Sequence, residues 1–330
     1  MANEWQDFGN EAMAVLFALY LQQQEKTGEM ILELDKELRL SNRFFPDSEL
    51  TKIISSLSDI SRLRVKKGTS LYRCRLIKKE DEDKFLGRIT SDWISLAKQF
   101  VPTIDRNSEM GAWLTLGAYF NNHEDELPRW KAAHNQLMES YSRPSFWGYD
   151  KAGSDAPSQG VSSAGRINPD GISYLYAADD VKTAILEVRP VPTQFVNVAQ
   201  IKVIEDINIY SFANPIAPDQ EGMDWFSWID YDEISKCFAQ PNYGGSSYYL
   251  ATQYLSEFIK HMKGPDGQAS FDGLCFHSSL NSDGTNYVLF DTSDTKKYEI
   301  CNSAVYQAND LLGNATCILP ISKPQDDQQN

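Results

Sequence analysis

The sequence predicts an α+β fold, in which helices gathered at the N-terminus precede a small twisted sheet. Apolar residues recur at helical spacing through residues 1–66 and again through residues 89–147. Asp-Gly and Ser-Asp-Gly turn signals flank the last two of the short runs that resemble strands. These runs, alternating or rich in β-branched residues, lie at 69–76, 173–177, 195–204, 207–212, 274–277 and 285–290.

The first 66 residues predict a small helical domain. The apolar stretch from Ala12 to Leu21 is about half the roughly 20 residues that cross a bilayer, so we expect a buried helix. Phe45-Pro46-Asp47 breaks the chain, and Asp47 or Ser48 is expected to cap the next helix. The apolar stripe of that helix is Leu50, Ile53, Leu57, Ile60 and Leu63. Both a packing role and a partner-docking role for this domain stay open.

The rest of the chain is expected to form a second domain and a C-terminal extension. The second domain spans 67–300 and carries a helical insertion at about 88–147, and the extension with its polar tail spans 301–330. Asp179 or Asp180 is expected to cap a helix that ends at Pro190. A further helix is expected at 246–263. We expect irregular segments at 78–84, 148–171, 213–244 and 324–330.

Charge and cysteine content exclude several classes of protein. The chain has 31 Lys and Arg against 46 Asp and Glu, a formal charge of −15, so non-specific nucleic-acid binding is not expected. The five cysteines are scattered and form no Cys-x-x-Cys motif, which favours reduced thiols in a cytoplasm and no metal site. The first residues lack the basic start of a signal peptide, so no membrane association is expected.

Common catalytic motifs are missing from the sequence. It contains neither a dinucleotide-binding glycine motif, a P-loop nor an H-E-x-x-H zinc motif, and its four histidines have no evident partner. The candidate catalytic and binding residues are therefore Arg, Tyr, Glu and Ser. Three segments combine a turn, an apolar run and a polar residue that the pattern does not require, namely 72–73, 165–187 and 272–290.

At these segments the sequence resembles the RES family, which is named for its Arg, Glu and Ser. The resemblance covers about 71–77 and 145–295, and the helical N-terminal domain is similar to the HEPN-like domain fused to some RES proteins. The segments that carry it, in the family's order, are LYR (71–73), GRINPDG (165–171), LYAA (175–178), TAILEVRP (183–190), DGLCFHS (272–278) and NYVLF (286–290).

The resemblance implies a fold similar to ADP-ribosyltransferases and cleavage of NAD⁺ at the nicotinamide–ribose bond, by water or by phosphate. NAD⁺ would be the substrate, with no further cofactor. Members of the family commonly act as toxins, or in antiphage defence, by depleting NAD⁺, and a small antitoxin often inhibits them. An inhibitor or trigger protein is therefore an expected partner, and a homo-oligomer stays open.

The residue types at the matching positions suit this chemistry. Arg73 and Arg166 occupy the positions for pyrophosphate binding, and a guanidinium binds oxyanions in bidentate fashion. Tyr176 or Tyr72 can stack on a cationic pyridinium. Glu187 can stabilise the positive charge that develops at the anomeric carbon. The expected catalytic residues are Glu187, Arg73, Tyr176 and Ser278, and the expected substrate-binding residues are Arg166, Tyr72, Asn168 and Asn286.

Structural roles compete with several of these assignments. Tyr176 also suits a core position, and Glu187 could pair with Arg189 on a helix face. The arginines could form ordinary salt bridges, and Asn168 and Asn286 could serve turns and structural hydrogen bonds. Ser279 follows Ser278, and a shift of one residue on a strand would exchange their faces.

Two other functions remain open beside NAD⁺ cleavage by water or phosphate. An ADP-ribosyltransferase that modifies a protein or nucleic acid would use the same pocket. An inactive binding module would rely on the acidic surface and on the large segments inserted at 88–147 and 213–244, which RES proteins often lack.

Overall fold

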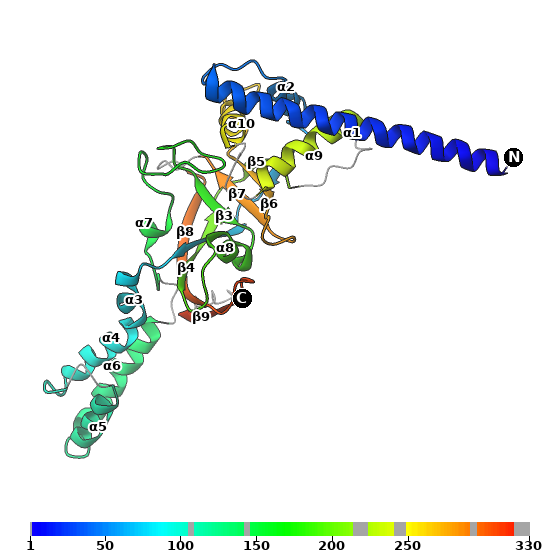
Figure 1. Ribbon diagram of the computed structural model, residues 1–330. Helices are drawn as coiled ribbons and strands as arrows, with labels where there is room; N and C mark the ends of the chain where they lie inside the picture. Colours follow the sequence, from blue (N-terminus) through cyan, green and yellow to red (C-terminus); the bar gives the residue numbers. More distant parts are fainter. Residues whose placement is uncertain are drawn as a thin grey trace, which may run out of the picture. The chain divides into compact units, whose positions relative to one another are not determined.

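The computed structural model describes residues 2–104, 109–141, 146–213, 224–240, 249–290 and 296–319. It confirms the α+β class (Figure 1). Contacts divide the chain into two compact units, of which the first comprises Met1–Tyr72, Asp155–Glu187 and Lys202–Glu299. The second comprises Arg73–Ser154, Val188–Ile201 and Ile300–Asn330. The predicted division at residue 66 does not separate these units, because the N-terminal helices pack within the first one.

Ten α-helices and nine strands are assigned within the described part of the chain. The helices are α1 (Ala2–Leu40), α2 (Glu49–Ser56), α3 (Lys79–Leu86), α4 (Arg88–Lys98), α5 (Glu109–Phe120), α6 (Leu127–Ser140), α7 (Lys151–Ser154), α8 (Val181–Val188), α9 (Trp225–Ala239) and α10 (Tyr249–His261). The strands are β1 (Arg62–Val65), β2 (Ser70–Leu76), β3 (Leu175–Ala178), β4 (Phe195–Val203), β5 (Ile207–Ser211), β6 (Gly273–His277), β7 (Thr285–Leu289), β8 (Tyr298–Ala308) and β9 (Ala315–Leu319).

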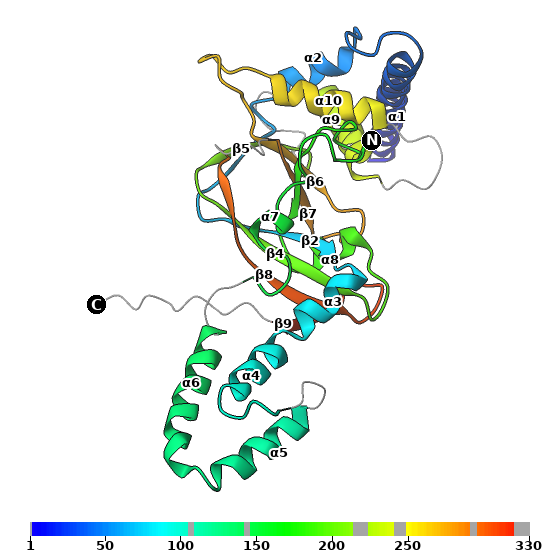
Figure 2. The same cartoon turned by 90° about the vertical axis from the view of Figure 1, so that its left-hand side faces the viewer.

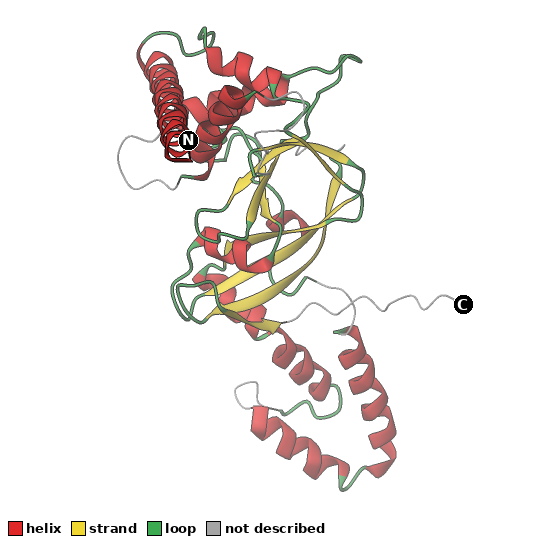
Figure 3. Cartoon of the chain, turned by 90° about the vertical axis from the view of Figure 1, so that its right-hand side faces the viewer, coloured by secondary structure: helices red, strands yellow, loops and turns green. Residues whose placement is uncertain are grey.

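The strands form one sheet in the order β1-β5-β6-β7-β3-β2-β4-β8-β9. In the first unit β5 and β6 are parallel, and β7 runs antiparallel to both β6 and β3. Figure 3 shows the strands in yellow. The parallel step needs a long crossover, and α9 and α10 lie in the chain between β5 and β6. Strand β7 therefore lies between β3, which contains Tyr176, and β6, which contains Cys275.

The core of the first unit joins its helices to the sheet. Leu50 and Ile54 of α2 are fully buried with apolar residues of α1, α9, α10 and the strands. Ser48 caps α2 by accepting a hydrogen bond from the amide of Leu50, which confirms one of the two predicted caps. The hydroxyl of Tyr210 in β5 donates to the carbonyl of Ile54 over 3.1 Å, so α2 is bound to the sheet by both packing and a buried hydrogen bond.

The first helix is much longer than the predicted Ala12–Leu21, and residues 13–19 are exposed rather than buried. The helix is fixed to α9 further along, where the buried carboxylate of Asp230 accepts hydrogen bonds from Gln23 and Thr27. The helices that pack on α1 meet it mainly over its C-terminal half, so the expectation that the helix at 12–21 is buried was wrong.

The second unit contains the predicted helical insertion, with α4, α5 and α6 in sequence (Figure 2). Helix α4 contacts both α5 and α6, and Trp93, Phe100 and Trp130 form part of their shared apolar core. Rings of Trp93 and Trp130 meet edge to face with centroids 6.2 Å apart, an arrangement that aromatic pairs prefer.

Three segments differ from the sequence predictions. Residues 79–86 form α3 instead of a loop, because three acidic residues stabilise its first turn and Phe85 is buried. Asp224 caps α9 within the segment predicted to be irregular. Strands β8 and β9 occupy the predicted C-terminal extension, where alternation is obscured by polar residues. The predicted disordered tail, 324–330, lies outside the described residues.

Replacing Leu50 with alanine should lower the free energy of unfolding by about 2–5 kcal/mol, because it removes a fully buried side chain from the core that joins α2 to the sheet. Urea unfolding followed by circular dichroism measures the change. Leu32→Ala is the matched control, since Leu32 is an exposed leucine of α1 and its loss should change stability by no more than about 0.5 kcal/mol. Equal effects of both substitutions would contradict this packing.

Candidate active site

Glu187 lies in the last turn of α8 and is held by two side-chain donors. Its Oε1 atom accepts a hydrogen bond from the Ser278 hydroxyl at 2.7 Å and another from the Asn286 amide at 2.7 Å. The Glu187 side chain is exposed, whereas the four residues before it are buried. The carboxylate is therefore fixed in direction through one oxygen, and its Oε2 has no hydrogen-bond partner among the described residues.

The turn between β6 and β7 sets the position of Ser278. The Ser278 amide donates to the carbonyl of Gly284, and the Ser278 hydroxyl accepts from the amides of Leu280 and Asn281. With these amides occupying its lone pairs, the hydroxyl donates to Glu187. Gly284 packs so closely on α8 that a Cβ atom there would lie 2.1 Å from the Thr183 hydroxyl oxygen. The turn therefore fits against α8 only with glycine at this position.

Several predicted residues share one face of the sheet. Asn286 in β7 is paired with Phe276 in β6 and with Ala178 in β3, and Ala178 is paired with Tyr72 in β2. Side chains of directly paired residues lie on the same face of the sheet, and so do the side chains of every second residue along one strand. Tyr176 therefore lies on the face of Asn286, Phe276 and Tyr72. This is also the face from which Asn286 reaches Glu187.

Asn168 organises the loop between Gly165 and Gly171. It is buried, its side-chain oxygen accepts from the Tyr176 hydroxyl at 2.7 Å, and its amide nitrogen donates to the carbonyls of Ser163 and Ile172, each at 2.9 Å. The loop is thus attached to β3 through the Tyr176 phenol. Within the described structure Asn168 uses its side chain to hold the loop, while the ring of Tyr176 remains half-buried.

Arg166 lies two residues before Asn168 in this loop. No described carboxylate neutralises the charge of its guanidinium. One Nη atom donates to the carbonyl of Phe238, and the guanidinium carbon lies 5.7 Å from the centre of the Phe276 ring. The Nε atom is buried and has no hydrogen-bond partner in the described part of the chain. An arginine beside the sheet face with no acidic partner among the described residues is suited to binding an anion.

Helix α10 supports the loop with two residues that the sequence analysis did not select. The Gln253 amide donates to the carbonyl of Gly165 at 2.6 Å, and the Thr252 hydroxyl donates to the carbonyl of Arg166 at 2.7 Å. Both side chains are buried on a helix whose other buried residues are largely apolar. Buried polar residues on a core-facing stripe were the signal that could have identified them.

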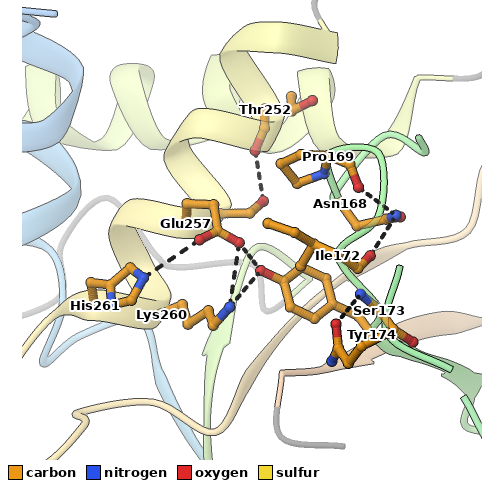
Figure 4. Close-up of polar contacts among 11 residues, drawn as sticks. Asn168, Pro169, Ile172, Ser173, Tyr174, Thr252, Glu257, Lys260 and His261 are labelled. Atoms are coloured by element: carbon orange, nitrogen blue, oxygen red, sulfur yellow. Dashed lines mark hydrogen bonds and ion pairs between the residues drawn. The ribbon is translucent and has the colours of Figure 1, made fainter. Parts of the chain in front are cut away.

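A polar cluster fixes α10 itself to the start of β3 (Figure 4). The hydroxyl of the buried Tyr174 donates to the carboxylate of Glu257, and Lys260 and His261 lie 3.5 Å from the same carboxylate. Burial, followed by the hydrogen bond to Glu257, strongly raises the pKa of Tyr174. The phenol therefore stays protonated and donates throughout the physiological pH range.

Tyr72 and Arg73 are consecutive in β2, and their side chains leave opposite faces of that strand. Tyr72 shares the face of Tyr176 in the first unit, whereas Arg73 is the first residue of the second unit. Arg73 is half-buried, and its role at the site stays a prediction.

Cys275 lies in β6 beside this site but does not resemble a nucleophile. Burial, partly offset by a hydrogen bond with the Ser211 hydroxyl, raises the pKa of the Cys275 thiol to about 11. The thiol is therefore protonated near neutral pH and unreactive. Among the described residues there is also no group of three His, Cys, Asp or Glu side chains that could hold a metal ion.

A cavity of about 430 Å³ lies on another side of α10, and none of the eight predicted site residues lines it. Its walls include Pro169 and Ile172 of the loop together with Gln253 and Glu257 of α10. The Gly165–Gly171 loop thus separates this cavity from the sheet face that carries Tyr176. In the described part of the chain no helix is long and apolar enough to cross a membrane.

The fold and the site together define an α+β protein with a candidate site for a ligand that has both anionic and hydroxyl groups. A helix-borne carboxylate, oriented by two donors, lies on the same side of a sheet as tyrosine rings and an arginine that has no acidic partner among the described residues. Such a set can bind an oxyanion and can place a negative charge near a sugar carbon.

The chain belongs to the RES domain family, whose members are associated with NAD⁺ processing. The family matches residues 129–306, which is more than half of the chain and includes Arg166, Tyr176, Glu187, Ser278 and Asn286. The match begins after the N-terminal helices and after Tyr72 and Arg73, so the HEPN-like character of the head stays a prediction. No curated protein and no solved structure matches the chain.

Replacing Asp180 with alanine should lower the free energy of unfolding by about 0.5–2 kcal/mol at neutral pH, because Asp180 caps α8 by accepting from the Thr183 amide at 2.9 Å. Burial acts to raise the pKa of Asp180, but hydrogen bonds from the Thr183 hydroxyl and amide outweigh it and lower the pKa.

A carboxylate whose folded-state pKa is lowered stabilises the fold above its unfolded pKa and loses that contribution as the pH falls. The difference between the wild type and Asp180→Ala should therefore shrink below the usual aspartate pKa of 3.8. Urea unfolding at several pH values measures it, with Asp59→Ala as the exposed control. A difference that is independent of pH would contradict the capping role of the ionised side chain.

Proposed function

We propose that the protein cleaves NAD⁺ at the bond between nicotinamide and ribose, with water or phosphate as the acceptor. The observation that carries the proposal is the carboxylate of Glu187, which Ser278 and Asn286 orient while leaving one oxygen open. All three residues lie within the part of the chain that matches the RES family. The reaction releases nicotinamide and forms a new bond at the anomeric carbon of ADP-ribose.

The open oxygen of Glu187 suits the charge that develops in this reaction. The glycosidic bond breaks through a state in which the ribose ring carries partial positive charge, and a nearby carboxylate stabilises that charge. Hydrogen bonds from Ser278 and Asn286 hold the carboxylate in one direction, so that little reorganisation is needed. Nicotinamide is a good leaving group, so a strong general acid is not required.

Arg166 and the tyrosines suit the other two parts of NAD⁺. The guanidinium of Arg166 has no acidic partner among the described residues, and a guanidinium can bind a pyrophosphate in bidentate fashion. The rings of Tyr72 and Tyr176 share the sheet face of Asn286 and can stack on the cationic pyridinium, an interaction worth about 0.5–2 kcal/mol. Arg73 is assigned to the pyrophosphate on family resemblance alone.

The products of NAD⁺ incubated with the purified protein test the proposal directly. We expect free nicotinamide, together with ADP-ribose when water is the acceptor or ADP-ribose phosphorylated at the anomeric carbon when phosphate is present. Chromatography with mass detection distinguishes these products. Label transferred from NAD⁺ to a macromolecule of a cell lysate would instead favour an ADP-ribosyltransferase. A folded protein that neither binds nor consumes NAD⁺ would overturn the proposal.

Glu187→Gln should reduce the rate of nicotinamide release by about 10²–10³, because it removes the negative charge but keeps the size of the side chain. Ser278→Ala and Asn286→Ala should each reduce it less, since they remove only one of the two donors that orient the carboxylate. Glu205→Gln is the matched control, because Glu205 is an exposed acid between β4 and β5. Unchanged turnover in Glu187→Gln would refute the assigned role.

In the cell, we propose that the protein is a cytoplasmic effector that arrests growth by depleting NAD⁺ and that an inhibitor protein restrains it. Family membership supports this role. Inducible expression in a bacterial host should lower cellular NAD⁺ and stop growth, while the Glu187→Gln variant should be tolerated. Equal toxicity of the two forms would show that growth arrest does not depend on this site.

A further inference from the structure

Residues 13–21 of α1 form an apolar segment that the described part of the chain leaves largely exposed. From Met13 to Leu21 its large apolar side chains are exposed, with 66% of Met13 and 62% of Phe17 open to solvent. Further along, Thr27, Ile31, Leu34 and Leu38 are buried against the other helices of the first unit. Figure 1 shows the same division, because the N-terminal part of α1 extends beyond α9. The exposed side chains are Met13, Val15, Leu16, Phe17, Leu19 and Leu21.

The exposed side chains surround the helix instead of forming one stripe. At 100° per residue, Met13 and Phe17 lie on one side of α1, while Val15 and Leu19 lie on the opposite side. A helix that is apolar on all sides is normally buried. Contiguous apolar patches beyond a few hundred Å² are rare on monomeric proteins, so this segment requires a cover.

Helix α9 covers only a small part of this segment. Tyr20 lies near Trp228 of α9, with ring centroids 6.4 Å apart. A hollow of about 530 Å³ separates the next turns of α1 from Trp225 at the start of α9. Its lining is entirely apolar or aromatic and consists of Met13, Leu16, Phe17, Tyr20 and Trp225. The two helices thus form an open apolar groove into which a further helix can pack.

We propose that this groove and the exposed turns of α1 form the interface of a homodimer, in which α1 and α9 of one copy pack against α1 and α9 of a second copy. A twofold interface pairs the same surface of each copy, and an uncharged apolar surface is complementary to itself. Two helices from each copy make a four-helix arrangement, which buries the side of each α1 that faces the other three helices.

The available surface is sufficient for a specific dimer. Aromatic side chains bury about 150–250 Å² each when fully covered, and aliphatic side chains bury less. The six exposed side chains of α1 are 37–66% open to solvent, so together they present roughly 500 Å² per copy. With Trp225 and the exposed Phe226 of α9, two copies present about 1,000–1,200 Å² of apolar surface, and an interface that buries most of it approaches the size of a specific interface.

Charge favours a second copy over other occupants. Residues 12–24 contain no charged side chain, so this surface has no electrostatic pattern with which to select a different protein. The stretch also lacks the Lys and Arg residues that hold interfacial helices on anionic lipid, and the chain carries a formal charge of −15. It is too short to cross a bilayer.

The double variant Leu16→Glu/Phe17→Glu tests the interface in the full-length protein. The wild type should have twice the mass of the chain in light scattering coupled to size exclusion, and it should dissociate on dilution. The double variant should be monomeric and should keep the circular dichroism spectrum of the wild type, because both side chains are exposed. Leu114→Glu is the matched control, since Leu114 of α5 is 69% exposed and its variant should remain dimeric.

Two results would overturn the proposal. One is a wild type that is monomeric at every concentration, including a monomer that floats with vesicles of anionic and zwitterionic lipid. The other is a double variant that stays dimeric, which would place the interface elsewhere. NAD⁺ turnover is measured separately, so failure of the dimer would leave the proposed activity of the Glu187 site untouched.

Discussion

The candidate site depends on one shared acceptor, the Oε1 atom of Glu187, which brings together a helix and two strands. Ser278 follows β6 and Asn286 lies in β7, so both donors reach the carboxylate only in the observed antiparallel register. A shift of one residue would turn Asn286 to the other face of the sheet. The close fit of Gly284 against Thr183 keeps the β6–β7 turn on α8 and thereby keeps donor and acceptor in range.

A second layer of buried polar contacts holds the loop that carries Arg166. Asn168 attaches this loop to Tyr176 in β3, and Gln253 holds the carbonyl of Gly165 from α10. Helix α10 is bound in turn to the beginning of β3 through Tyr174 and Glu257 (Figure 4). Each group is paired and at least half-buried, and such pairs fix one arrangement of loop, helix and strand. The position of the Arg166 guanidinium therefore follows from packing behind the site.

The contrast between the two halves of α1 illustrates the limit of local patterns. The run from Ala12 to Leu21 indicates a helix correctly, but its apolar character alone cannot indicate what covers it. Similarly, the acidic run at 79–84 suggests a solvated loop, although Phe85 adds the one buried residue that fixes α3. In β8 the alternation is obscured because Asn302 and Ser303 are polar and yet buried. In each case the deciding contact comes from residues distant in sequence.

The sequence by itself determined the α+β class, the strands near 175 and 275–289, a helix cap at Asp47 or Ser48 and the family to which the chain belongs, because periodicity, turn residues and short motifs are local properties. It also selected Glu187, Ser278 and Asn286 separately. Only the tertiary structure decided that these three side chains meet, that Ser278 and not Ser279 reaches the carboxylate, and that Gln253 and Thr252 hold the loop. Such contacts join residues about 90 to 100 positions apart, and strand register and helix packing bring them together.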